Sequence, residues 1–550
     1  MSTTLSPSRT RAADDRGLTR SQRERLRRLT PALVSALFAA TYVIVSPASL
    51  DLADHLFRAQ LFRDEGFGLW NNLWYSGHHI VGYSVLFPAV SALITPQLAG
   101  ALAATGTAAL FEPLARRHFG SRAFLGAILF GAATAIDLYT GRLAFAFGAL
   151  PALAAVAALD RGATLPACGL ALLSALCSPV AALFAALIAG GYALGGLSSA
   201  RRIGPALPGT AVAVAALAPV GLLALAFPEG GTEPFGLATM LPVLVLVALA
   251  VATLPREATT FRAGLAIYGL ATVVVYLVPS PIGSNIARLG TFLAAPVGAL
   301  LWWQRRRTLL AVAILPLLYL GWAAPVRDVV SASGDQSAST GYYQPLLRFL
   351  RARSTGVHAL VPFRVEIPFT RFHWEAWVVA SHFALARGWE RQLDIADNPL
   401  FYHPHLTPSS YEAWLDSNAI RFVAAPDAPL DYSAQAEMAL IDQGLPYLHM
   451  VMHSAHWRVY AVANPTPIAT GVASLTRLGP DSLTLHAQRP GPVLLHVHFT
   501  PYWALTQGSG CVAPAGRWTQ LTLRRAGSVT LATRFSLNRI GATSRRCTSP

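Results

Sequence analysis

The sequence contains no lysine: all 42 of its Lys+Arg residues are arginine. Charge of either sign is scarce, because Asp, Glu and Arg together make up only 13% of the 550 residues, whereas hydrophobic residues make up 53%. The mean hydropathy is +0.45, which lies outside the usual range of soluble globular proteins. Repeated apolar runs of about 20 residues in such a chain predict a multi-span membrane protein.

Several motifs that carry phosphate, acyl or metal chemistry are also absent. We find no Walker phosphate loop, no dinucleotide glycine fingerprint after a strand and no serine nucleophile elbow. The richest histidine group, "HPH" at 403–405 with His373 and His382, meets no zinc spacing. A cytoplasmic nucleotide site and a protein-bound zinc site are therefore not expected.

The formal net charge of +15 is concentrated at the N-terminus, in "SRTRAADDRGLTRSQRERLRR". This stretch is too long and too charged for the start of a signal peptide, and the apolar run that follows it offers no small-residue cleavage site. We expect residues 1–30 to be a disordered cytoplasmic arm ahead of an uncleaved first span. Basic arms beside a membrane serve anionic lipid and topology, so no nucleic-acid partner is expected.

The apolar runs predict about eleven transmembrane helices, at 31–50, 83–111, 123–138, 142–158, 164–177, 178–196, 206–227, 236–254, 263–279, 289–303 and 308–324. The second run is too long for one span, and Pro88 and Pro96 interrupt it, so its first half is expected along the interface. Arginines gather in alternate loops, such as "ARRHFGSR" and "QRRRT", on the side of the N-terminal arm. The positive-inside rule places that side in the cytoplasm, so the loop at 51–83 and everything after Ala324 lie outside.

From residue 325 the pattern changes to shorter and more polar segments. Helical and strand-like stretches alternate up to residue 465, which predicts a small extracytoplasmic α/β domain. Short alternating strands divided by Pro and Gly follow from 466 to 550 and predict a β-sandwich. Cys511 and Cys547 flank its last strands and are expected to form a disulfide, whereas Cys168 and Cys177 lie in apolar runs as inert packing.

The first outer loop is unusually rich in charge and aromatic residues. It begins "DLADHLFRAQLFRDEGFGLWNNLWYSGHHIVGYSVLFP" directly after the first apolar run. Hydrocarbon does not tolerate these charges cheaply, so the loop must meet water or do chemistry at the membrane surface.

This loop resembles the first outer loop of the GT-C superfamily of membrane glycosyltransferases. It is most similar to an actinobacterial branch labelled "6-pyruvoyl-tetrahydropterin synthase-related", which resembles the YfhO family in layout. The later stretch "FHWEAWVVASHFALARGWERQLDIADNPLFYHPHLTPSSYEAWL", with "TPYWALTQGSGC", resembles the outer domain of the same branch. The resemblance implies a GT-C-like fold and sugar transfer from a polyprenyl-phosphate carrier on the outer face of the membrane.

By this resemblance, an acid just past the first span is the catalytic base, and Asp51 is the matching position, with Asp54 as the other candidate. Such a carboxylate takes a proton from the acceptor hydroxyl as the anomeric carbon is attacked. Alternatively, Asp51 and Asp54 would cap the following helix or lie in water without a catalytic role. Arginines at outer span ends need a reason, and phosphate binding is one, which singles out Arg288, Arg142 and Arg58.

The acceptor or the sugar would be held by an acid and by aromatic or histidine side chains near the same surface. The candidates are Asp137, Trp70, Trp74, Tyr75, His55 and His78. Asp137 would equally form a salt bridge to Arg142, and the aromatic residues would equally form an interfacial belt. A divalent cation such as Mg or Mn is a further open possibility.

The sequence thus favours a plasma-membrane enzyme of cell-envelope or cell-wall biogenesis, a hexosyl- or pentosyltransferase acting on a glycan, glycolipid or protein acceptor. Two alternatives stay open: a non-catalytic scaffold with the same fold, and a lipid or solute transporter. A transporter should show charges at mid-membrane depth and related halves, whereas the charges here gather at the outer ends.

Overall fold

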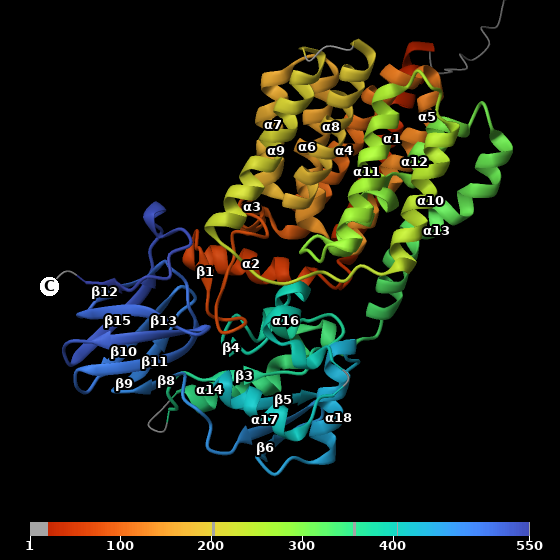
Figure 1. Cartoon of the computed structure of the whole chain (residues 1–550). Coiled ribbons are helices and arrows are strands. Elements are labelled where there is room, and N and C mark those ends of the chain that lie inside the picture. The colour runs from red at the N-terminus through yellow and green to blue at the C-terminus, as the bar shows by residue number, and fades with distance from the viewer. Residues whose placement is uncertain (1–19, 201–203, 356–358, 404, 549–550) are drawn as a thin grey trace, which may run out of the picture.

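The computed structural model describes residues 20–200, 204–355, 359–403 and 405–548. A bundle of long apolar helices carries two β-containing domains at one of its ends, which we call the domain side (Figure 1). Of the expected arm, residues 1–19 lie outside the described residues. Residues 20–30 are helical rather than disordered, because α1 (Arg20–Val45) already begins at Arg20. Arg, Gln, Glu and Leu in this stretch are strong helix formers, so the span extends outward as one helix.

The bundle is built by helices α1 and α4 to α13. After α1 come α4 (Pro96–Phe119), α5 (Ala123–Tyr139), α6 (Leu143–Asp160), α7 (Thr164–Cys177), α8 (Pro179–Ala200), α9 (Leu207–Ala226), α10 (Leu237–Thr253), α11 (Thr259–Leu277), α12 (Ala287–Trp302) and α13 (Arg307–Ala332). By length and hydropathy, eight helical segments of the described chain are candidate spans, and one of these, Pro96–Tyr139, contains both α4 and α5. The shorter apolar helices α7 and α10 complete the set. The chain is therefore a multi-pass helical membrane protein, and these helices match the expected runs one by one.

Two short helices lie at the domain side of the bundle. They are α2 (Leu52–Glu65), which follows α1, and α3 (Phe87–Ile94), which precedes α4. Pro88 lies in the first turn of α3 and Pro96 begins α4, and Thr95 between them adopts a left-handed φ of 77°. The prolines therefore do divide the long second run, as expected.

The first of the two domains on this side is α/β. Its sheet has the order β4-β3-β5-β7-β6, with β4 (Ala384–Leu385), β3 (Arg364–Glu366) and β5 (Ile420–Pro426) parallel, and β7 (Trp457–Val462) and β6 (Leu448–His453) antiparallel. The helices that accompany it are α14 (Gln344–Ser354), α15 (Glu375–Val378), α16 (Arg391–Asp397), α17 (Pro408–Ser417) and α18 (Gln435–Gln443). Helix α13 runs on to Ala332, past the boundary expected at residue 325, so the last span leads directly into this domain.

The second domain contains two antiparallel sheets. One has the order β12-β15-β10-β9 and the other β16-β13-β14-β11-β8. Their bounds are β8 (Ala469–Gly471), β9 (Ala473–Leu478), β10 (Ser482–Ala487), β11 (Gly491–His498), β12 (Trp503–Gln507), β13 (Gly510–Ala515), β14 (Trp518–Leu523), β15 (Gly527–Thr533) and β16 (Arg546–Cys547). Alternating buried residues such as Leu483, Leu485, Val493 and Leu495 from both sheets form one core. A disulfide joins Cys511 to Cys547 across β13 and β16.

The first outer loop connects the bundle with both domains. It forms a small hairpin of β1 (Trp70–Asn71) and β2 (His78–His79). The Leu73 carbonyl accepts a hydrogen bond from Leu385 N of the α/β domain, and the Ser76 carbonyl accepts one from His498 N of the sandwich. This loop is therefore a shared structural element of three parts of the molecule.

Candidate active site

Asp51 lies where the first span ends and α2 begins, on the domain side. It occupies the N-cap position of α2, but its side chain makes no capping hydrogen bond and stays half-buried. The turn between α5 and α6 packs directly on this point: a Cβ on Gly141 would clash with Ser49 Oγ and come 3.1 Å from Leu52 N. This close approach brings the end of α5 and the start of α6 next to Asp51.

Four charged side chains at the domain-side ends of their helices interact electrostatically, and we call them the charged cluster: Asp51, Asp137, Arg142 and Arg288. Arg288, in the first turn of α12, interacts electrostatically with the other three. Its Nε is buried and has no hydrogen-bond partner. None of the four forms an ion pair within 4.0 Å, although the described chain has many such pairs elsewhere. Two arginines and two acids, at the ends of α2, α5, α6 and α12, thus interact electrostatically without forming ion pairs.

Two further acids face the charged cluster, and the sequence analysis did not single them out. Glu233, in the loop from α9 to α10, interacts electrostatically with Arg288 and Asp51 and accepts a hydrogen bond from Ser284 Oγ at 3.0 Å. Burial raises the pKa of Glu233, while Ser284 and Arg288 oppose the shift. Asp328, near the end of α13, interacts with Arg142 and Asp51. The signal for Glu233 was a pair of acids between two prolines in the loop from α9 to α10, "PEGGTEP".

Asp54 and Arg58 are placed differently from Asp51, although they share its helix. Arg58 Nε donates to Asp54 Oδ1 at 2.6 Å, and the opposite side of the guanidinium pairs with Glu390 of the α/β domain. Both side chains are buried. Burial raises the pKa of Asp54, against the effect of Arg58 and His55. Arg58 therefore ties α2 to the α/β domain and is engaged by two carboxylates, whereas the sequence predicted it as a phosphate ligand.

His55 lies beside this pair and not on a sugar-binding surface. Its Nδ1 is 3.5 Å from Asp54 Oδ2, and its ring packs on Tyr83 and Phe87. Burial lowers the pKa of His55, so the ring is neutral at physiological pH.

The structure also places the aromatic residues of this loop differently from the prediction of a sugar-binding surface. Trp70 packs edge-on against Trp503 in the sandwich core, and Trp74 stacks on Phe57 at 4.3 Å in the α/β core. Tyr75 Oη accepts a hydrogen bond from Glu390 N at 2.8 Å. All of them are buried, so no face is free to stack on a sugar.

His78 is buried as well and stacks parallel to Trp74. Its Nε2 contacts Asn71 Nδ2 at 3.2 Å. The sequence showed aromatic and polar residues at a membrane surface, but not the distant segments that cover them.

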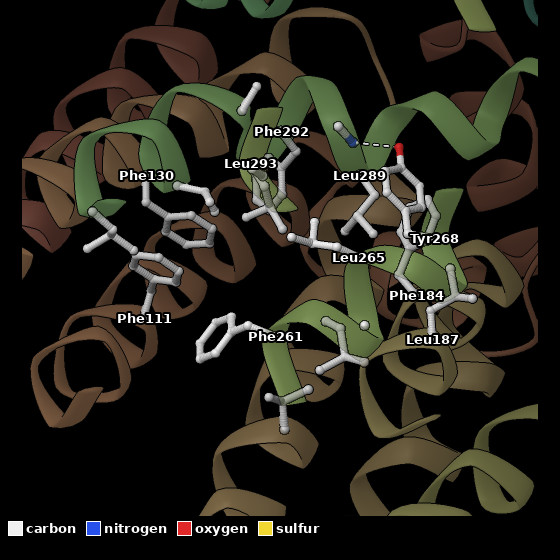
Figure 2. A pocket seen from close by; sticks show the side chains of 18 of the residues that line it. Phe111, Phe130, Phe184, Leu187, Phe261, Leu265, Tyr268, Leu289, Phe292 and Leu293 are labelled. Atoms are coloured by element: carbon white, nitrogen blue, oxygen red, sulfur yellow. Dashed lines mark hydrogen bonds between the residues drawn. The ribbon is translucent and has the colours of Figure 1, made fainter. Parts of the chain in front are cut away.

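A long apolar cavity of about 340 Å³ runs through the bundle, and none of the four residues of the charged cluster lines it. Leu289 and Gly290, the neighbours of Arg288 in the chain, line its domain-side end. The end of the cavity far from the domains is lined by His118, in the last turn of α4, and by Phe261, in the first turn of α11. Nearly all of its surface is aliphatic or aromatic (Figure 2).

The domain-side end of this cavity is fixed by one hydrogen-bonded side chain. Tyr268 Oη donates to the Ile286 carbonyl at 2.9 Å. It also accepts from Gly290 N at 3.0 Å, the bond drawn in Figure 2. These bonds hold the first turn of α12, which contains Arg288, beside this end of the cavity.

The excess of carboxyls near Arg288 raises the question of a divalent cation. Among the described residues, no three or more His, Cys, Asp or Glu side chains are close enough together to hold a metal ion. The residues present thus do not fit a protein-built metal site.

The chain has little similarity to known proteins. No model of a known protein family matches it, and no curated protein does. A solved structure of the archaeal oligosaccharyltransferase AglB from Archaeoglobus fulgidus, in complex with an inhibitory peptide and a dolichol-phosphate, aligns with a TM-score of 0.42 and 11% sequence identity. The alignment covers 73% of this chain and 70% of AglB. A likeness at this level identifies neither a family nor an activity.

Proposed function

We propose that this protein is a membrane glycosyltransferase that moves a sugar from a polyprenyl-phosphate carrier to an acceptor at the outer face of the plasma membrane. One observation carries the proposal. At the end of the apolar cavity that Leu289 and Gly290 line, the preceding residue Arg288 forms no ion pair and interacts electrostatically with Asp51 and Arg142. In this proposal the N-terminus lies in the cytoplasm and the β-containing domains lie outside. The arginines at the opposite ends of the helices, for example Arg116, Arg256 and Arg306, support this orientation.

The cavity and Arg288 suit the two parts of such a donor. A polyprenyl chain is a flexible hydrocarbon, and the lining of phenylalanine, leucine and alanine side chains offers it an apolar path through the bundle. Its phosphate would then reach the domain-side end, where Arg288 and Arg142 are unpaired. A guanidinium binds phosphate oxygens with two parallel hydrogen bonds, and in a partly desolvated site this interaction is strong.

Asp51 supplies the base in this arrangement. Its carboxylate takes the proton of an acceptor hydroxyl while the acceptor oxygen bonds to the anomeric carbon and the bond from that carbon to the phosphate oxygen breaks. The electron pair of the broken bond leaves with the lipid phosphate, whose added negative charge Arg288 stabilises. The proton ends on Asp51 and passes to water. Attack opposite to the leaving phosphate inverts the anomeric centre.

The acceptor would enter between the charged cluster and the α/β domain. Arg391 of α16 interacts electrostatically with Glu233 and is held by Asp431 through two hydrogen bonds of 2.7 and 3.0 Å. Its guanidinium lies 4.7 Å from the ring centre of Tyr432, which is 58% exposed. An exposed aromatic ring beside fixed charges is a surface suited to a carbohydrate acceptor, with the ring on an apolar sugar face.

The test is sugar transfer by the purified full-length protein in liposomes, with labelled polyprenyl-phosphate hexoses and pentoses and a panel of envelope glycans, glycolipids and peptides. Wild type is compared with Asp51→Asn, Arg288→Gln and, as a matched control on the same helix, the exposed Asp64→Asn. Transfer by wild type and by Asp64→Asn, with loss in the other two, supports the proposal.

Other outcomes point to the alternatives. Undiminished transfer in Asp51→Asn removes the assigned base. If no donor supports transfer and Asp51→Asn still complements a deletion strain, the non-catalytic scaffold is favoured. Movement of the labelled lipid between leaflets without transfer favours a transporter.

A further inference from the structure

The sandwich carries an apolar loop that none of the chemistry above uses. Residues 534–546 connect β15 to β16 and include a 3₁₀ turn, Leu537–Arg539. Three large apolar side chains of this loop face outward: Phe535 is 47% exposed, Leu537 76% and Ile540 40%. Grouped exposed apolar side chains on an otherwise folded domain mark an interaction surface.

The loop is held in a defined shape by its own polar groups. Arg539 Nε donates to the Pro501 carbonyl at 3.1 Å, and Arg539 Nη2 donates to the Ser544 carbonyl at 2.7 Å. The Cys511–Cys547 disulfide fixes the strand that follows. The apolar side chains are thus displayed by an ordered element of the sandwich.

Contacts with the bundle set the height of this loop relative to the membrane. Phe535 packs against Phe227 at 5.7 Å between ring centres, and Phe227 follows directly on the last residue of α9, Ala226. Tyr502, which also contacts Phe535 at 5.3 Å, donates a hydrogen bond from its hydroxyl to the Ala226 carbonyl at 2.5 Å. Leu225, one residue earlier, is 69% exposed on the lipid-facing side of α9.

The figure agrees with these contacts. In Figure 1 the dark blue end of the chain rises from the sandwich to the level at which α9 ends. The loop therefore continues the lipid-facing surface of a span at its interfacial end.

Two arginines of the loop face solvent with no acidic partner. Arg534 and Arg545 are exposed, and within the described chain neither forms an ion pair. The loop thus presents apolar side chains flanked by free guanidinium groups, the combination that binds the headgroup region of a bilayer.

We propose that residues 534–546 insert into the outer leaflet beside α9 and attach the β-sandwich to the membrane. Phe535, Leu537 and Ile540 would lie at the boundary of headgroups and acyl chains, roughly 5–10 Å deep. Arg534 and Arg545 would bind lipid phosphates. The ligand is the phospholipid surface itself, so the inference depends on the bundle spanning a bilayer but not on the transferase activity.

Depth-dependent quenching tests this directly in the full-length protein. In a Cys168→Ala, Cys177→Ala background, single cysteines at 537, 225 and 525 carry an environment-sensitive fluorophore in liposomes with spin-labelled lipids. Position 225 reports the span end. Position 525 is exposed in the turn before β15, and the seven residues of β15 place it roughly 20 Å from the loop.

We expect the label at 537 to be quenched several-fold more than the label at 525, with blue-shifted emission, as at 225. Quenching at 537 equal to that at 525 would overturn the proposal. Arg534→Gln with Arg545→Gln should reduce the gain in quenching that anionic lipids produce. If anionic lipids make the same difference in this variant, the role of the two arginines is wrong.

Discussion

Asp51 and Asp54 lie three residues apart, and their surroundings separate their roles. Asp54 is buried with Arg58 Nε at 2.6 Å and neutralises a cation that also pairs with Glu390. Asp51 is half-buried, has no ion pair within 4.0 Å and interacts electrostatically with Arg288. A base must meet its substrate, so the proposed chemistry belongs to Asp51 and the structural role to Asp54.

The first prediction concerns Asp51. Asp51→Asn keeps the shape of the side chain and removes its ability to accept a proton, so transfer should fall by roughly 10²–10⁴-fold, the usual contribution of a positioned base. The thermal unfolding midpoint should stay close to wild type, since Asp51 forms no ion pair. Initial rates at saturating donor, measured beside Asp64→Asn, check both statements. A fall no larger than that of Asp64→Asn contradicts the assignment.

The second prediction concerns Asp54. Asp54→Asn leaves Arg58 buried with half of its compensating charge, and breaking a buried ion pair costs about 3–5 kcal/mol of unfolding free energy. The unfolding midpoint should therefore fall clearly, while protein that stays folded retains transfer. Asp64→Asn, exposed on the same helix, should change stability by less than about 0.5 kcal/mol. An unchanged midpoint for Asp54→Asn would show that the pair does not stabilise the fold.

For single residues, the sequence was informative where the position of the residue along a span determined whether it lies inside the bundle or at one of its ends. Arg288 and Asp137, both predicted at the same ends of their spans, interact electrostatically in the structure, and their shared site stays a prediction. Trp74 and His78 could not be placed, because the residues that bury them, such as Ala376, lie about 300 positions away. Local pattern carries no information on such long-range contacts.

At the scale of elements, the turn from α5 to α6 positions the charged cluster. Gly141 adopts a φ of 78° and packs against Ser49 and Leu52 so closely that a Cβ does not fit. Gly162, in the turn from α6 to α7, has the same φ of 78° but no atom near its Cβ position. Replacing either glycine would cause the same backbone strain. Only at Gly141 would the added Cβ also clash with neighbouring atoms.

The third prediction uses this matched pair. Gly141→Ala should push the turn away from the start of α2 and lower transfer far more than Gly162→Ala, because only the first change displaces Asp51 from Arg142 and Asp137. The measurement is kcat for both variants at equal amounts of folded protein. Equal activities would mean that the close packing at Gly141 does not position the cluster.

The fourth prediction concerns pH and the α/β domain. Glu375 is buried, and burial raises its pKa from 4.5 to about 7 despite hydrogen bonds from Thr370 and Tyr343. Because the folded state holds this proton more tightly than the unfolded state, its stabilising contribution is complete below pH 4.5 and is lost as the pH rises through 7. The loss is at most about 3 kcal/mol.

The check is the unfolding midpoint between pH 5 and 8.5. Glu375→Gln should flatten its decline with pH, whereas the exposed Glu412→Gln should not. Burial also raises the pKa of Glu437 to about 7, so its contribution to stability is lost over the same pH range. Part of the decline in the unfolding midpoint should therefore remain in Glu375→Gln. A pH profile identical to wild type in Glu375→Gln would show that this carboxyl does not titrate in the range.

Elements were the level at which sequence pattern was most informative. Apolar runs located α1 and α4 to α13, since a helix in lipid must satisfy its own backbone and be apolar along its length. The prolines located the break before α4. The start of α1 at Arg20 was missed because charge was taken as a sign of disorder, whereas a span continues as a helix beyond the bilayer when its residues favour it.

At the scale of the whole molecule, the cavity runs through the bundle toward the side on which the proposed chemistry would take place. Leu265 lines it, and Leu270 on the same helix α11 is 66% exposed toward lipid. The two leucines therefore separate an effect on the cavity from an effect on the helix.

The fifth prediction follows. Leu265→Trp should fill part of the cavity and raise the KM for long-chain polyprenyl donors, with a smaller effect on short-chain donors that do not reach this depth. Leu270→Trp should leave both values near wild type. KM series for donors of two chain lengths in detergent micelles are the measurement. An equal effect of Leu265→Trp on both donors would place the lipid chain outside the cavity.

The contacts of the loop at 51–83 with both C-terminal domains also determine when this loop can fold during synthesis. Trp74 is fully buried, with its Nε1 bonded to the Ala376 carbonyl, and Asn72 N donates to the Pro480 carbonyl. These partners leave the ribosome some 300 and 400 residues after the loop itself, tens of seconds later at roughly 5–20 residues per second. Until then the hairpin of β1 and β2 lacks its partners in both domains, although α2 before it already has α3 and the bundle to pack against. The turn from α5 to α6 can therefore position Asp51 early, whereas the hairpin that follows is buried only once both C-terminal domains have folded, so a truncated chain would insert its spans and leave this loop without its partners.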